Sequence, residues 1–167
     1  MARPQVDERH IAGENPLERA LRLSLAKARA VAQRYPDAIV IGSDQVAAVG
    51  DGVLDKPGDA ATCVAQLATL GGKTAKFYTG CAVISSSARL ELTHVDTTSV
   101  VFRALTNAEI TRYVAAEQPF DCAGGFKVEG LGISLFERVE SADPTALIGL
   151  PLIWLATALR EAGFPVP

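Results

Sequence analysis

The carboxylate of Asp44 follows a short apolar run, Ala38–Ile41, and the pair Gly42-Ser43. Such a run is typical of a strand that is buried on both faces of a sheet. In open α/β sheets ligands bind at the carboxyl ends of the strands, so the pattern places Asp44 where catalysis commonly occurs. The alternative is that Asp44 only caps a turn or a helix after the strand.

Two further acids and two lysines could act with such a carboxylate. Asp7 and Glu8 could hold a divalent cation, although two acids in a polar segment can also be simply solvated. Lys27 lies beside the apolar stripe of a predicted helix, so its ammonium could reach a cleft or remain an ordinary exposed charge. Lys56 precedes Pro57 on a restricted, extended backbone, which suits a phosphate contact without requiring one.

A glycine-rich segment lies late in the chain, with four glycines in the nine residues 124–132. Glycines at this density allow a sharp turn or a close approach of the backbone to a ligand. The pattern matches neither the dinucleotide fingerprint G-x-G-x-x-G after a strand nor the P-loop G-x-x-x-x-G-K-[ST]. Both of those nucleotide-binding motifs are therefore excluded.

Helices and strands alternate along the chain in a way that predicts an α/β fold. Asn15, Pro16 and Glu18 form a helix start with a capping box. We expect the buried stripe of this helix to consist of Leu17, Leu21, Leu25, Ala28 and Ala32. Other helices are predicted after Asp59, Thr106 and Pro151, and strands over residues 77–84, 89–102 and 133–138. The long hairpin formed by residues 77–102 predicts a mixed, twisted sheet flanked by helices.

Composition restricts the class of protein. The chain has 167 residues, of which 49% are hydrophobic, and a net charge of −3. This is the profile of a globular protein with one domain or two intimate lobes, and with no overall attraction to nucleic acid. The chain shows no apolar run of about 20 residues and no leader, so we expect a cytoplasmic protein without a membrane partner. Cys63, Cys81 and Cys122 are far apart, which favours reduced thiols.

The order of several short motifs resembles the Maf family of nucleoside triphosphate pyrophosphatases, which have a house-cleaning role. The motifs are Val6-Asp7-Glu8, Lys27-Ala28, Ile41-Gly42-Ser43-Asp44-Gln45, Lys56-Pro57, Tyr78-Thr79-Gly80, Asp121-Cys122-Ala123-Gly124, Glu129-Gly130-Leu131-Gly132 and Gly149-Leu150-Pro151-Leu152. The resemblance implies a single Maf-like domain over residues 1–167, with two intimate lobes and a cleft between them. Phe126-Lys127-Val128-Glu129-Gly130 is most similar to the branch that acts on 7-methyl-GTP.

The resemblance also implies roles for particular side chains. Water would attack the α-phosphorus, with Asp44 as base, metal ligand or both, and Glu8 as a second acid facing a Mg²⁺ or Mn²⁺ ion. The residues expected to bind the nucleoside triphosphate are Lys27, Gln45, Lys56, Lys127 and Glu129. A carboxylate at Glu129 would favour the positive charge of 7-methylguanine, which guanine lacks. A homodimer is a further expectation from the family.

One departure leaves alternatives open. Members of the family begin with a strand and a Ser-x-Ser-Pro-Arg/Trp-Arg segment that grips the triphosphate, and this chain starts after that point. Either the sequence is truncated or the protein has lost the element, and loss would weaken phosphate binding. The alternative functions are a pyrophosphatase for dTTP and UTP, and a non-catalytic protein that binds nucleotides or regulates division.

Overall fold

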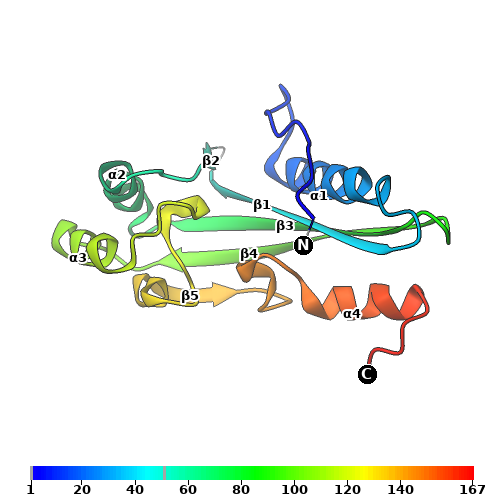
Figure 1. Cartoon of the computed structure of the whole chain (residues 1–167). Coiled ribbons are helices and arrows are strands. Elements are labelled where there is room, and N and C mark those ends of the chain that lie inside the picture. The colour runs from blue at the N-terminus through cyan, green and yellow to red at the C-terminus, as the bar shows by residue number, and fades with distance from the viewer. Residues whose placement is uncertain (1, 51) are drawn as a thin grey trace. The chain divides into compact units, whose positions relative to one another are not determined.

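The computed structural model describes residues 2–50 and 52–167, which form helices and strands (Figure 1). The α-helices are α1 (Pro16–Ala32), α2 (Ala60–Leu70), α3 (Asn107–Glu117) and α4 (Leu152–Glu161). The strands are β1 (Ile39–Val49), β2 (Gly52–Leu54), β3 (Thr74–Ser85), β4 (Leu90–Phe102) and β5 (Phe136–Glu140). Short 3₁₀ helices are η1 (Ala123–Gly125), η2 (Leu131–Leu135) and η3 (Ala146–Ile148). The predicted α/β class is confirmed.

The strands are hydrogen-bonded in the order β2-β1-β3-β4-β5. β1 pairs with β2, and β4 with β5, in antiparallel register. The chain divides into two compact units. Unit 1 contains Met1–Gln45, Tyr78–Thr97 and Ala142–Pro167, and unit 2 contains Val46–Phe77 and Thr98–Ser141. In the described part of the chain, no helix combines the length and the apolar character needed to cross a bilayer.

The helix starts that the sequence predicted are confirmed by their caps. Asn15 accepts a hydrogen bond from the backbone N–H of Glu18, whose carboxylate accepts one from the Asn15 N–H in return. Thr106 and Glu109 form the same reciprocal box at α3, and Asp59 caps α2. These boxes satisfy donors that the first helical turn would otherwise leave without partners. Local sequence therefore determines where these helices begin.

The predicted buried stripe of α1 is wrong in part. Ala28 and Ala32 are buried as expected, but Leu17 is exposed and Leu21 and Leu25 are only half-buried. The buried face instead consists of Ala20, Leu23, Ser24, Ala28 and Ala32. Small residues at positions 20, 24 and 28 follow one another at successive turns, so this face lies close to the strands beneath it.

Two strand glycines explain why the small face is the buried one. A Cβ added to Gly80 of β3 would lie 2.3 Å from the carbonyl oxygen of Ala20. A Cβ on Gly42 of β1 would lie 2.6 Å from the carbonyl oxygen of Ser24 and 2.8 Å from the backbone nitrogen of Ala28. These distances are too short for any side chain, so α1 rests directly on the backbone of β1 and β3. A leucine in place of Ala20, Ser24 or Ala28 would hold the helix away.

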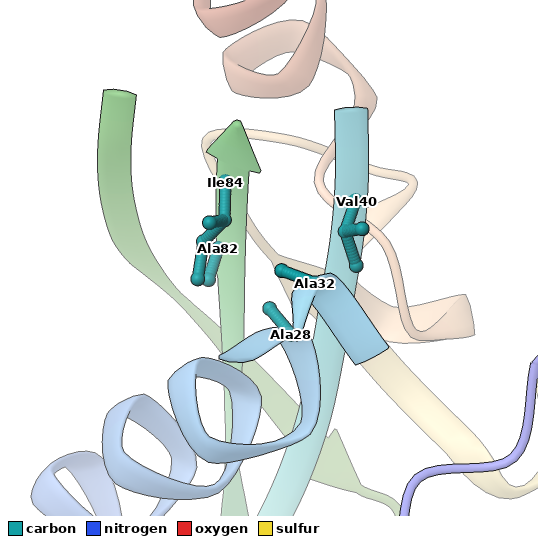
Figure 2. Close-up of a cluster of buried hydrophobic side chains, with 5 residues drawn as sticks. All are labelled: Ala28, Ala32, Val40, Ala82 and Ile84. Carbon is teal, nitrogen blue, oxygen red and sulfur yellow. The ribbon is translucent and has the colours of Figure 1, made fainter. Parts of the chain in front are cut away.

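In unit 1, α1 and α4 cover opposite faces of the strands. Figure 2 shows Ala28 and Ala32 of α1 beside Val40, Ala82 and Ile84 of β1 and β3. A second cluster joins Leu155 and Ala158 of α4 to Cys81 and Val83. Because neighbouring residues of a strand point to opposite faces, the alternation along β3 places the two helices on different sides of it. Unit 1 is therefore a helix–sheet–helix sandwich.

The position of Asp44 differs from the prediction. β1 does not end near Ile41 but continues to Val49, so Asp44 lies within the strand and not after its carboxyl end. Ile41 is 43% exposed, whereas β3 is buried continuously from Thr79 to Ser85. The strand that is buried on both faces is thus β3. The predicted strand over 133–138 is also shifted, because η2 precedes β5 there.

Unit 2 is built around a cluster of aromatic rings. Phe126 packs edge-on against Phe77, Phe102 and Phe136, with ring centroids 4.8–5.6 Å apart. Edge-to-face rings at these distances are favourable beyond the area that they bury. Phe126 follows η1 directly, so the cluster fixes the start of the glycine-rich segment in unit 2.

We predict that Gly80→Ala destabilises the protein by about 2–3 kcal/mol, because the new methyl group would collide with the backbone of α1. The free energy of unfolding in urea measures this effect. Gly52→Ala is the matched control, since its added Cβ would meet nothing closer than 3.5 Å. The control should stay within about 0.5 kcal/mol of the parent chain. Equal effects of the two substitutions would contradict the close packing of α1.

Candidate active site

Lys27 of α1 and Asp44 of β1 form the centre of the candidate site. The ammonium nitrogen of Lys27 donates to the Asp44 carboxylate over 2.6 Å. Their side chains are only 19% and 12% exposed, so the pair is largely removed from water. Close packing of α1 on Gly42 places the helix above the same face of β1 from which Asp44 projects. The interpretation of Lys27 as an ordinary exposed lysine is therefore wrong.

Glu8 reaches the same lysine from the N-terminal segment. Its carboxylate lies 2.9 Å from the Lys27 ammonium nitrogen, although 57% of its side chain remains exposed. Two carboxylates thus share one ammonium, and they come from segments far apart in the sequence. The structure brings together three of the predicted site residues, namely Glu8, Lys27 and Asp44.

Burial governs the protonation of this pair. Loss of water raises the pKa of Asp44, and the hydrogen bond from Lys27 opposes that rise without cancelling it. The negative charge of Glu8 raises the Asp44 pKa further, and the positive charge of Arg19 lowers it. Burial alone would lower the pKa of Lys27, but its bonds to Asp44 and Glu8 outweigh burial and raise it. A carboxylate with a raised pKa is a better proton acceptor than a solvated one.

The side chain of Gln45 points to the other face of β1. It follows Asp44 directly, and adjacent residues of a strand project in opposite directions. Its amide nitrogen donates to Thr79 Oγ1 over 2.9 Å and to the carbonyl oxygens of Ala146 and Leu147 over 3.1 Å each. The structure therefore does not bring the Gln45 side chain to the Asp44 carboxylate, and Gln45 ties β1 to η3.

Ser43 is a structural partner that sequence reasoning missed. Its hydroxyl lies 2.8 Å from the carbonyl oxygen of Gly80 and 2.6 Å from that of Gly149. Ser43 and Gln45 together hold the segment 146–149 against β1, on the face opposite Asp44. These bonds give the polar residues of β1 partners, which is why the strand continues through them instead of ending at Ile41.

Two arginines of α1 were also missed. The charge of Arg19 acts on Asp44, and the charge of Asp44 raises the pKa of Arg22 as a secondary effect after its bond to Glu14. The signal in the sequence was helical spacing, because positions 19 and 22 are one turn apart on the helix that carries Lys27.

The other predicted binding residues lie in unit 2. The Lys127 ammonium is 3.9 Å from the Asp121 carboxylate, and the charges of Lys127 and Lys56 both help to lower the Asp121 pKa, after hydrogen bonds to that carboxylate. Glu129 is exposed two residues after Lys127. Tyr113 fixes this loop, because its hydroxyl accepts a hydrogen bond from the Lys127 backbone N–H over 3.1 Å. Unit 2 therefore gathers Lys56, Lys127 and Asp121 beside its glycine-rich loop.

The acids of unit 1 fit one mode of holding a divalent cation. Among residues 2–50 and 52–167, no group of three or more His, Cys, Asp and Glu side chains is arranged to hold a metal ion. Mg²⁺, however, usually binds through one or two carboxylates together with water and the phosphates of a substrate. Glu8 and Asp44 supply two carboxylates on a common partner, which matches that mode.

Comparison with known proteins places the chain in a family. Residues 1–162 match the family described as Maf-like protein. The chain belongs to the Maf family, and the resemblance drawn from the order of its motifs is confirmed.

Similar proteins come from several bacteria. A protein of Xanthomonas oryzae pv. oryzae (strain MAFF 311018) is 54% identical over 165 residues, covering 99% of this chain and 86% of the relative. A protein of Hahella chejuensis is 47% identical over 152 residues, covering 91% and 76%. One of Cupriavidus metallidurans is 48% identical over 166 residues, covering 99% and 83%. Each of the three is named 7-methyl-GTP pyrophosphatase.

We predict that the Asp44 carboxyl titrates above 3.8, the usual value for Asp, in a ¹³C NMR titration of the folded protein. Lys27→Met should raise the midpoint further, because it removes the hydrogen bond and the positive charge that favour the ionised acid. Lys27→Arg keeps the charge and should leave the midpoint below that of Lys27→Met. A lower midpoint in Lys27→Met than in the parent chain would contradict this account of the pair.

Proposed function

We propose that this protein hydrolyses 7-methyl-GTP, or a related modified nucleoside triphosphate, to the monophosphate and pyrophosphate. Membership of the Maf family and the names of the relatives support the reaction. The observation that carries the proposal for this chain is the partly buried Lys27–Asp44 pair with Glu8 beside it. A lone acid on a solvated turn would offer no comparable arrangement.

In the proposed reaction, Asp44 accepts a proton from a water molecule as that water attacks the α-phosphorus. A bond forms between the water oxygen and the α-phosphorus, and the bond from this phosphorus to the bridging oxygen breaks. Pyrophosphate leaves with the electrons of the broken bond, and the proton passes from Asp44 to solvent. Burial suits Asp44 to this task because it raises the pKa of the carboxyl above its ordinary value, which makes the carboxylate a stronger base.

Lys27 has two functions in this proposal. Its ammonium orients the Asp44 carboxylate through the 2.6 Å bond, and it offers positive charge to a phosphate group as negative charge shifts toward the leaving pyrophosphate. An ammonium has three N–H donors, so bonds to Asp44 and Glu8 leave one for substrate. Lys56 of unit 2 is proposed as a further phosphate-binding lysine.

Glu8 and Asp44 are the residues that would hold a Mg²⁺ or Mn²⁺ ion. Such an ion, when bound, neutralises charge on the phosphates and polarises the phosphorus that is attacked. The chain's own part is to bring both carboxylates to the ammonium group of Lys27.

Base selection is proposed for the loop of unit 2 that carries Lys127 and Glu129. The negative charge of Glu129 would favour 7-methylguanine, which is positive, over guanine, which is not. The proposed contribution of Gln45 is a structural one, through the bonds that fix η3 to β1.

The direct test is a panel of 7-methyl-GTP, GTP, dTTP and UTP with Mg²⁺, in which both monophosphate and pyrophosphate are measured. We expect the highest kcat/KM for 7-methyl-GTP and equal amounts of the two products. Preference for dTTP and UTP would assign the chain to another branch of the family. Calorimetric binding of nucleotide without turnover would support the non-catalytic alternative.

Asp44→Asn should lower kcat about a hundredfold to ten-thousandfold, because the amide cannot accept the proton from water. Asp37→Asn is the matched control, since Asp37 is exposed in the turn before β1 and should keep full activity. Circular dichroism would verify that both variants fold. Turnover of Asp44→Asn close to that of the parent chain would remove Asp44 from the mechanism.

Glu129→Gln should reduce the ratio of kcat/KM for 7-methyl-GTP to that for GTP at least about fivefold, the effect of losing one charge–charge contact near water. Glu137→Gln is a suitable control because Glu137 is an exposed acid of unit 2 on β5. An unchanged ratio in Glu129→Gln would reject the charge argument while leaving the pyrophosphatase assignment intact.

A further inference from the structure

The segment Asp7–Ile11, called the strap below, crosses α1 and carries Glu8 to Lys27. Two arginines of α1 bind its backbone. Arg19 donates from its guanidinium to the carbonyl oxygen of Glu8 over 3.3 Å, and Arg22 donates to that of Arg9 over 3.3 Å. The two donors are one helical turn apart and the two acceptors are neighbours in the strap. The spacing of α1 therefore matches the spacing of the strap's carbonyl groups.

Apolar packing does little to hold the strap in place. Ile11 is 52% exposed, and a hollow of about 380 Å³ lies between the strap and α1, lined by Asp7, Arg9, His10, Ile11 and Arg22. The polar contacts consequently decide where the strap lies. Glu14 holds Arg22 in position, because its carboxylate accepts two hydrogen bonds from the Arg22 guanidinium, of 2.5 and 2.8 Å.

Arg19 differs from Arg22 in the partners of its other guanidinium nitrogens. Among the described residues, the Arg19 Nε is buried and has no hydrogen-bond partner. A buried donor without an acceptor lowers stability, so a methionine of similar length would be the better choice if Arg19 only filled space. What an arginine adds at this position is the bond to the Glu8 carbonyl and a positive charge near Asp44.

We propose that Arg19 is a positioning residue for Glu8: its guanidinium fixes the Glu8 backbone on α1, so that the Glu8 carboxylate meets Lys27 beside Asp44. Arg22 supports the same strap one residue further along. The inference rests on the proposed function, in which Glu8 and Asp44 hold a divalent cation with the nucleotide. Arg19 acts through Glu8, in the way that outer residues orient the ligands of a metal.

The test compares Arg19→Met with Arg29→Met, a matched control on the same helix whose arginine makes an exposed ion pair with Glu91. The first measurement is the rate at which trypsin cleaves after Arg9, within the strap. Arg19→Met should raise this rate about tenfold, because the loss of one charged hydrogen bond frees the strap. Arg29→Met should leave it unchanged.

The second measurement is the affinity for Mn²⁺, read from its EPR signal in the presence of 7-methyl-GMP and pyrophosphate. Arg19→Met should weaken binding about tenfold, the usual effect of removing an outer residue that orients a ligand. The same substitution made in Glu8→Gln should cause no further loss, because Arg19 has nothing left to position. Full additivity of the two effects would overturn the proposal.

Stability separates positioning from a merely structural role. Arg19→Met should leave the midpoint of urea unfolding unchanged or slightly higher, since it removes the buried Nε that has no partner. Lower stability together with an unchanged trypsin rate after Arg9 would overturn the proposal. The trypsin result decides the role of Arg19 even if the chain releases no pyrophosphate, so failure of the proposed function would be seen separately.

Discussion

The contact between Lys27 and Asp44 depends on how closely α1 approaches the sheet. Gly42 and Gly80 have no side chains, so Ala20, Ser24 and Ala28 lie directly on the strand backbone. From that distance a lysine side chain on α1 reaches a carboxylate on β1 within 2.6 Å. A bulkier residue at either glycine would raise the helix and separate the pair. The packing of small residues is therefore what makes the charged pair possible.

The side chains of three consecutive residues of β1 alternate between the two faces of the strand. Ser43 and Gln45 face one side, where they bind backbone carbonyls of β3 and of the segment 146–149. Asp44 faces α1, where its partner is Lys27. The two neighbours of Asp44 thus fix this stretch of the strand, and Asp44 itself projects from the opposite side. An acid on a strand held in this way keeps its geometry better than one on a loop.

The sequence predicted what depends on local interactions. The capping boxes at Asn15 and Thr106, the α/β class and the membership of the Maf family were all correct.

The predictions were wrong where contacts between residues far apart in the sequence determine the local structure. Leucines of α1 were expected in the core, but glycines on two strands selected the small face instead. β1 was expected to end before Asp44, but Gly149 and Ala146, about a hundred positions away, supply partners that extend it. The family resemblance named Glu8 and Lys27 for the site, but their direct contact was not predicted, because it depends on the path of the strap over α1.

We propose that Lys27 and Asp44 act as one unit in cleaving the nucleotide. The most direct measurement is a double-mutant cycle on kcat for pyrophosphate release, with Lys27→Met, Asp44→Asn and the two combined. Groups that act together lose most of their effect when either is removed, so the double variant should be no slower than the slower single variant. Multiplicative losses in the double variant would show that the two residues contribute independently, and would contradict the account.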